Sequence, residues 1–182
     1  MSSPRYALIV LPQGFEEVEA VTPIDMLRRA GVSVTIASLD ERPEVTGRNG
    51  MALLADAPLD VSFSRSYDMV ILPGGPGVKY LRSDPRIIDL VRKQAARGAW
   101  VAAICAAPTV LHDAGLLHGK RYTAHHSVAG ELGAILESER VVVDAPIITS
   151  RGAGTALDFG LELVARLVSP EAAQEVRASI CG

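Results

Sequence analysis

The sequence predicts an α/β fold in which helices cover both faces of a mostly parallel central sheet. Short apolar runs, typical of buried strands, alternate along the chain with helical patterns, and this alternation indicates parallel βαβ units. The 182 residues, of which 48% are hydrophobic, match the size of one compact domain, and no repeat or linker divides them. We therefore expect a single domain over residues 1–182. The expected strands are Tyr6–Leu11, Val32–Leu39, Met69–Leu72, Trp100–Ile104 and Val141–Ser150.

The first expected helix lies between the first two strands. Its apolar residues recur at about one helical turn, at Val18, Val21, Ile24 and Leu27. Gly31 suits the left-handed position that follows a helix. Pro23 has to occupy the first turn or kink the helix, because proline lacks the N–H that a helix interior uses.

Proline and capping residues mark the later helices. The expected starts are Ser83-Asp84-Pro85, Pro108, Ala156 and the residues after Ser169-Pro170. The first three of these helices should end near Gly98, Gly115 and Val168.

Two segments are less regular. Pro146 interrupts Val141–Ser150, and since proline cannot donate to a central ladder we expect two short strands there. Asp40–Asp60 mixes charged residues and glycines with the apolar run Met51–Leu54, which could form an edge hairpin.

Composition argues against several partners and compartments. Eighteen basic and 21 acidic residues give a formal net charge of −3, and at most two basic side chains are adjacent, so no nucleic-acid or anionic-membrane surface is expected. No apolar run approaches the ~18 residues that span a bilayer. The first run, Tyr6–Leu11, is also too short for a secretion signal. We therefore expect a cytoplasmic protein.

The two cysteines, Cys105 and Cys181, form neither a CxxC pair nor a Cys/His cluster. Neither a disulfide framework nor a zinc site is expected, and no metal is assigned. A free thiol is the simpler interpretation.

Cys105 stands where a buried strand is expected to meet the start of a helix. Its neighbours two positions away, Ala103 and Ala107, are small, as the sharp turn of a nucleophile elbow requires. The N–H groups of the helix start would favour a thiolate. The alternative is a buried core cysteine, since free cysteine is among the most buried residue types. The local pattern favours neither.

A glycine turn, Leu72-Pro73-Gly74-Gly75-Pro76-Gly77, follows the third expected strand. Ligands of open parallel sheets bind beyond the carboxyl ends of the strands, so this turn and Cys105 should share one sheet edge. Its backbone N–H groups could stabilise an oxyanion, although a tight connection explains the glycines equally well. No GxxxxGK[ST] or GxGxxG pattern is present, so no nucleotide cofactor is expected.

Acidic and imidazole groups are candidates for proton transfer at that edge. Glu16, Glu17 and Glu19 follow the first strand, and for two of them helix capping is a sufficient role. A glutamate in a desolvated cleft could instead have a raised pKa and donate a hydrogen bond to a thiolate. His125 and His126 lie in an expected loop or short strand, where a histidine could assist a cysteine nucleophile or simply face solvent. His112 and His118 receive no role.

These residues stand in the order and spacing of a known family. The matching pieces are Ala7-Leu-Ile-Val, Glu16-Glu17-Val18-Glu19-Ala20, Pro23-Ile24-Asp25, Arg29-Ala30-Gly31, Asp56-Ala57, Tyr67-Asp68, Leu72-Pro73-Gly74-Gly75, Ala102-Ala103-Ile104-Cys105-Ala106-Ala107-Pro108-Thr109 and Thr149-Ser150-Arg151-Gly152. Over nearly its whole length the chain resembles the ThiJ/PfpI superfamily, and within it the DJ-one (Parkinsonism-associated protein deglycase) subfamily, as a bacterial-type member.

The resemblance implies a flavodoxin-like three-layer sandwich, usually a homodimer, that needs no cofactor. It implies that Cys105 is the reactive thiol and that Glu19 stays protonated beside the sulfur. Gly75 and Ala106 would supply backbone donors, with Gly74 in the same turn.

The resemblance also implies surroundings for the thiol. His125 corresponds to a histidine near the thiol in many members, but His126 follows it where the family often has proline. Arg48 and Arg151 correspond to arginines near the pocket and the dimer edge, and could receive an oxidised thiol or an anionic substrate.

Three functions follow from the resemblance. The first is a glyoxalase or deglycase that processes a small α-oxoaldehyde, such as methylglyoxal, or a glycated group, and the second is a redox-sensing chaperone oxidised at Cys105. The third, a cysteine peptidase, is disfavoured because Ala106 stands where that branch places a histidine. A thiolate, oxyanion donors and an acid/base suffice for methylglyoxal conversion, and a low-pKa thiol also suits a sensor. The motif therefore fits both of the first two functions.

Overall fold

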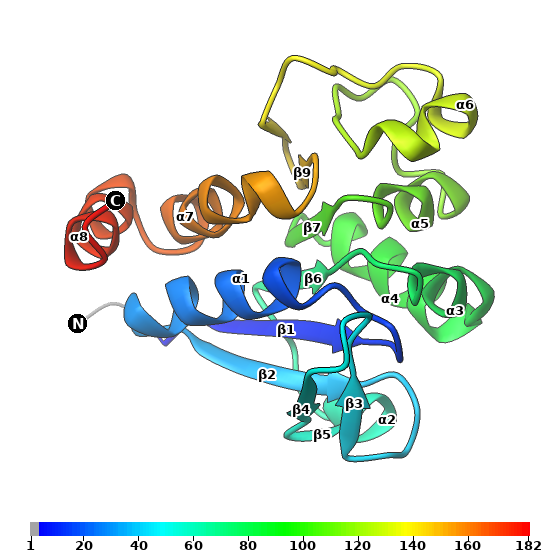
Figure 1. Ribbon diagram of the computed structural model, residues 1–182, viewed down its shortest axis with the longest axis horizontal. Coiled ribbons are helices and arrows are strands. Elements are labelled where there is room, and N and C mark those ends of the chain that lie inside the picture. The colour runs from blue at the N-terminus through cyan, green and yellow to red at the C-terminus, as the bar shows by residue number, and fades with distance from the viewer. Residues whose placement is uncertain (1–3) are drawn as a thin grey trace.

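The structure, a computed structural model, describes residues 4–182 (Figure 1). Within these residues, seven strands form one sheet in the order β5-β2-β1-β6-β7-β9-β8. Every neighbouring pair is parallel except β8 and β9, so the predicted α/β fold with a mostly parallel sheet is confirmed. The strands are β1 (Tyr6–Leu11), β2 (Ser33–Ser38), β5 (Ala57–Pro58), β6 (Met69–Leu72), β7 (Trp100–Ile104), β8 (Val141–Asp144) and β9 (Ile147–Ser150).

Helices cover both faces of this sheet and create two cores. Figure 1 shows α1 (Glu17–Arg29), α7 (Ala156–Leu167) and α8 (Pro170–Ser179) on one side. The other face packs against α2 (Leu59–Ser62), α3 (Val78–Ser83), α4 (Pro85–Ala96), α5 (Pro108–Asp113) and α6 (Ala129–Leu132). Successive side chains of β1 alternate between the two cores: Ile9 joins the first, whereas Leu8 and Val10 join the second. Fully burying such a side chain contributes about 1.5–3 kcal/mol.

The element ends follow the predicted caps. Gly31 has a φ of +78° just after α1. The side chain of Asp84 accepts a hydrogen bond from the N–H of Arg86 at the start of α4, and Ser169 caps α8 in the same way. The predicted break at Pro146 is confirmed, because β8 and β9 form an antiparallel hairpin around it.

Of the two places expected for Pro23, the structure shows the interior of α1 and not its first turn, which leaves the carbonyl of Glu19 without its intrahelical N–H donor. Two other segments differ from the sequence-based expectation. The helix α3 was not expected, since no capping side chain precedes it. The hairpin of β3 (Glu44–Thr46) and β4 (Ala52–Leu54) is a separate two-stranded sheet, and β5 forms the edge of the main sheet instead.

The parallel strands place several loops at one edge. The turns after β1, β6, β7 and β9 all lie at the carboxyl ends of neighbouring strands, which are the ends that carry the predicted site residues. Two short 3₁₀ helices, η1 (His126–Val128) and η2 (Ala153–Thr155), complete this edge. Among residues 4–182, no helix is both long and apolar enough to cross a membrane.

Candidate active site

Cys105 occupies a sharp turn between β7 and α5. Its φ of +66° is left-handed, a conformation that costs a non-glycine residue roughly 1–2 kcal/mol. Two backbone hydrogen bonds of 2.9 Å hold it: the N–H of Cys105 donates to the carbonyl of Ser150, and its carbonyl accepts from the N–H of His125. The thiol is only partly buried. The predicted elbow is therefore confirmed, in preference to a core cysteine.

The carboxyl group of Glu19 lies beside this thiol. Glu19 belongs to the first turn of α1, is 1% exposed, and its Oε2 accepts a 2.9 Å hydrogen bond from the N–H of Gly74. The N–H of Ala153 also hydrogen-bonds the carboxyl, and the Cys105 side chain forms a further hydrogen bond with it. Strand ends β6, β7 and β9 thus converge on one acidic side chain.

Burial changes the ionisation of both groups. It raises the pKa of Glu19 to about 7, and the nearby carboxyl of Glu16 adds to this rise. Burial, together with an ionised Glu19, raises the pKa of the Cys105 thiol to about 12. The N–H groups of Gly75 and Ala106 hydrogen-bond the sulfur and act in the opposite direction.

The N–H of Ala106 at the helix start lowers the pKa of the Cys105 thiol, as expected, but burial and the charge of an ionised Glu19 outweigh it. A thiolate at Cys105 can therefore form in two ways: a base takes the thiol proton, or Glu19 is itself protonated and does not repel the sulfur. With a pKa of about 7, Glu19 can hold or release that proton at neutral pH.

The glycine turn is required by close packing. A Cβ atom at Gly74 would lie 2.5 Å from the Cβ of Cys105 and 3.0 Å from its sulfur. Gly75 has a φ of +93°, and a Cβ there would lie 2.6 Å from the backbone N of Glu16. No other residue type fits at either position without displacing the thiol or the start of α1.

The other two glutamates have separate roles. Glu16 caps α1, since its Oε2 accepts a 2.8 Å hydrogen bond from the N–H of Glu19. Glu17 accepts hydrogen bonds from the backbone N–H and the side-chain amide of Asn49, at 2.6 and 2.9 Å. This buried carboxylate fixes the loop that carries Arg48. Sequence reasoning missed the contact, although the Asn49-Gly50 pair is a turn signal.

Of the two adjacent histidines, His125 lies at Gly152, the residue that also borders the thiol. The Cβ position of Gly152 lies 3.4 Å from Cδ2 of His125 and 4.0 Å from the sulfur of Cys105. The N–H of Ser127 donates to Nδ1 of His125 at 3.2 Å, which leaves the ring proton on Nε2. Burial lowers the pKa of His125, as do the charges of His126, Arg151 and Arg48, so its ring is neutral at pH 7. The exposed His126 stacks on it with the ring centres 4.0 Å apart.

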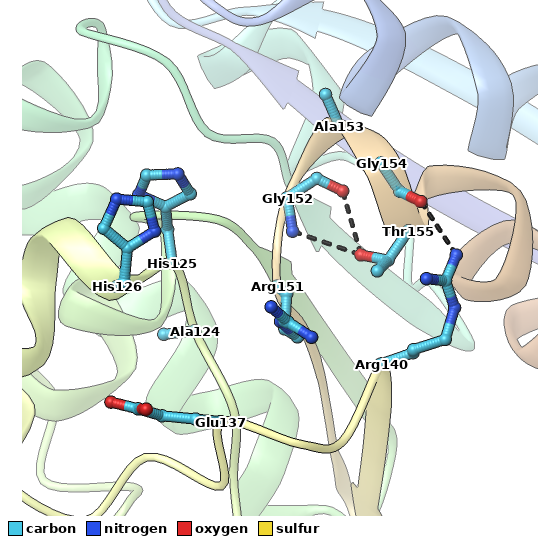
Figure 2. Close-up of a pocket in the computed structure, with 10 residues that line it drawn as sticks. All are labelled: Ala124, His125, His126, Glu137, Arg140, Arg151, Gly152, Ala153, Gly154 and Thr155. Atoms are coloured by element: carbon cyan, nitrogen blue, oxygen red, sulfur yellow. Dashed lines mark hydrogen bonds between the residues drawn. The ribbon is translucent and has the colours of Figure 1, made fainter.

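A pocket of about 410 Å³ opens beside His125 (Figure 2). The two histidines, Arg140, Arg151 and the Gly152–Thr155 turn line it, and Glu137 is the acidic side chain among its lining residues. Arg48 lies outside the lining set, but its charge reaches His125. Within residues 4–182, neither Arg48 nor Arg151 forms an ion pair with a carboxylate.

Elsewhere, His112, Asp113 and Glu131 bring three potential metal-ligating atoms within 4.8 Å of one another. Arg82 already forms salt bridges with both carboxylates of this cluster. We assign this cluster no part in the site. His118 likewise contacts none of the site residues named here.

The chain was compared with models of known protein families. The model of the DJ-1/PfpI family matches residues 5–166. The chain belongs to the DJ-1/PfpI family. This confirms the resemblance drawn from the motifs, and the elbow, the glycine turn and Glu19 lie within the matched range.

Relatives cover almost the whole chain. Protein dj-1beta of Drosophila melanogaster is 39% identical over 176 residues, which are 94% of each chain. Its crystal structure superposes with a TM-score of 0.95 over 98% of both chains, at 37% identity, and the flavodoxin-like fold expected from the resemblance is thereby confirmed. The Caenorhabditis elegans protein named glutathione-independent glyoxalase DJR-1.2 is 34% identical over 185 residues, covering 100% of this chain and 98% of its own.

Proposed function

We propose that this member of the DJ-1/PfpI family is a glyoxalase of the glutathione-independent type that needs no cofactor and uses Cys105 as nucleophile. The observation that carries the proposal is the contact of one thiol with two backbone N–H groups and with a carboxyl group whose pKa is about 7. The name of the C. elegans relative supports it. Methylglyoxal is the model substrate and lactate the product.

In the first step, the sulfur adds to the aldehyde. Ionised Glu19 takes the thiol proton while the sulfur bonds to the aldehyde carbon of methylglyoxal. The carbonyl electron pair moves to oxygen, where the N–H groups of Gly75 and Ala106 stabilise the developing charge. Glu19 then returns the proton to that oxygen, and a neutral hemithioacetal results.

In the second step, one proton moves between carbons. Glu19 removes the hydrogen of the hemithioacetal carbon as a proton, and the electron pair passes to the neighbouring ketone, giving an enediolate. The N–H at Nε2 of neutral His125 donates a hydrogen bond to the ketone oxygen. Glu19 returns its proton to the former ketone carbon while the hydroxyl proton moves to the former ketone oxygen, which gives a thioester. Water hydrolyses the thioester to lactate and the free thiol. Methylglyoxal and water are thus consumed in equal amounts.

The proposal is tested by lactate formation from methylglyoxal with fully reduced, chelator-treated protein and no glutathione. We expect turnover by wild type and by Cys181→Ser, because Cys181 is exposed near the end of α8, and none by Cys105→Ser. Turnover that persists in Cys105→Ser would exclude the thiol as nucleophile.

The same assay separates the alternatives. A redox sensor would consume one equivalent of peroxide at Cys105 and form no lactate. A deglycase would use the same thiol adduct on a glycated amine or thiol, so release of the free amine from such a substrate distinguishes it. A peptidase finds no support, because Ala106 follows the cysteine where that chemistry needs histidine.

We propose that the chain acts as a homodimer through the exposed face of α1. Val18 and Val21 belong to the apolar pattern of α1, yet their side chains are not buried in the core. They are 47% and 40% exposed. Met51, which is 54% exposed, belongs to the loop held by Glu17 next to this face. Exposed apolar side chains such as these are typical of a protein interface when they lie together.

A further inference from the structure

The pocket beside the thiol offers more room than methylglyoxal needs. Its volume of about 410 Å³ equals the space of roughly a dozen water molecules at ~30 Å³ each. Gly152 lies between the pocket and the thiol, and a Cβ atom there would lie 3.4 Å from His125, 3.6 Å from Glu19 and 4.0 Å from Cys105. Because glycine has no Cβ atom, residue 152 places no side chain between the pocket and these groups.

The two arginines that line the pocket differ in whether they form an ion pair. Arg140 is bound at 2.6 Å to Asp158 and at 2.8 Å to the carbonyl of Gly154, so it holds the pocket wall (Figure 2). Arg151 has no carboxylate partner among residues 4–182 and is exposed. Figure 2 shows Arg151 below Gly152, whereas the carboxylate of Glu137 lies under the histidines, on the side away from Arg140.

We propose that this pocket is a subsite for the negatively charged end of an α-oxoaldehyde substrate, with Arg151 as its counter-ion. The inference rests on the proposed function and adds a substrate class: an α-oxoaldehyde whose far end is a carboxylate or another small anion. The aldehyde reaches Cys105 past Gly152, and the anion lies against the guanidinium. Arg48 adds positive charge at His125, and Glu137 acts against binding.

The first test measures occupancy without turnover. In a Cys181→Ser background, iodoacetamide alkylation of Cys105 is followed in the presence of 4-oxopentanoate or its methyl ester, which differ only in the charge. We expect the acid to protect Cys105 at a concentration about tenfold lower than the ester, as a charge-assisted hydrogen bond predicts.

Variants that replace a charged side chain by the neutral side chain of glutamine test which charged residue acts on the anion. Arg151→Gln should raise the half-protecting concentration of the acid about tenfold, whereas Glu137→Gln should lower it several-fold, because it removes the opposing charge. Arg65→Gln is the control for net charge, since Arg65 stacks on Tyr6 at the opposite end of β1. Equal protection by acid and ester, no protection by the acid, or an effect of Arg151→Gln no larger than that of Arg65→Gln would overturn the subsite.

The second test measures turnover of 4,5-dioxopentanoate and its methyl ester. We expect the ratio of their kcat/KM values to favour the acid in wild type and to fall about tenfold in Arg151→Gln. If wild type processes neither compound nor methylglyoxal, the proposed function is wrong, and the protection assay still decides the subsite. If it processes both compounds with a ratio that Arg151→Gln leaves unchanged, the function stands and the subsite is wrong.

Discussion

The Oε2 atom of Glu19 and the backbone N–H of Gly74 form a 2.9 Å hydrogen bond between residues 55 positions apart. This bond holds the carboxyl of Glu19 at Gly74, the residue that also packs against Cys105. Any side chain at position 74 would occupy the space between the acid and the thiol.

Gly74→Ala tests that packing. The new methyl group would overlap Oε2 of Glu19 and lie 2.5 Å from the Cβ of Cys105, so one of the two side chains must move. We expect methylglyoxal turnover to fall about 100-fold, as a displacement of about 1 Å can cause. Unfolding in urea should show a loss of about 1–3 kcal/mol. Gly130→Ala is the control, because nothing lies within 4 Å of the added methyl group there, and it should keep both turnover and stability.

The raised pKa of Glu19 predicts a pH-dependent stability. Between about 4.5 and 7, the folded chain holds the Glu19 proton and the unfolded chain releases it, so the free energy of unfolding falls as pH rises through this window. At about 1.36 kcal/mol per pKa unit the fall attributable to Glu19 is about 3 kcal/mol. Urea unfolding of wild type and Glu19→Gln at pH 4.5 and 8 measures it. The account requires a smaller fall in the variant, and equal falls would show that Glu19 has an ordinary pKa.

The same group predicts a pH–rate profile. Because ionised Glu19 is the base, kcat/KM for methylglyoxal should rise with pH and level off above about 7. Burial and the nearby charges of His126, Arg151 and Arg48 lower the pKa of His125 below its ordinary value. A profile that is flat from pH 5 to 8 would exclude a base with this pKa.

The homodimer predicts a charge-sensitive interface. Val21→Asp places a carboxylate on the exposed face of α1 and should convert a particle of twice the chain mass into one of single mass in light scattering at micromolar concentration. Val61→Asp on α2 is the control, since Val61 is 59% exposed on another face. A wild-type protein of single mass would rule out the dimer.

Short sequence patterns were sufficient to predict several strands of the sheet. The strands β1, β6 and β7 follow from apolar runs, whereas the small neighbours at positions 103 and 107 allowed an elbow at Cys105 without deciding between it and a buried core cysteine. The sequence left two places open for Pro23, the first turn or the helix interior, and the structure shows the interior. Gly160 of α7 lets α1 approach so closely that a Cβ there would lie 3.4 Å from Cα of Pro23.

Contacts between distant residues could not be predicted from these signals. The motif suggested that Glu19 lies near Cys105, but only the fold shows that burial raises both pKa values and that ionised Glu19 opposes the thiolate. The bond from Asn49 to Glu17, which fixes the loop of Arg48, joins residues 32 positions apart.

The central claim is that Glu19 serves as the base of Cys105, and Glu19→Gln tests it most directly when alkylation and turnover are measured on one preparation. Burial and the charge of Glu19 both raise the pKa of the Cys105 thiol, and Glu19→Gln removes the second cause, so iodoacetamide should react with Cys105 at least as fast as in wild type at pH 7. Lactate formation from methylglyoxal should fall by about 100-fold or more, because the amide cannot accept and return a proton. Wild-type turnover in Glu19→Gln would contradict the account and transfer the role of base to His125.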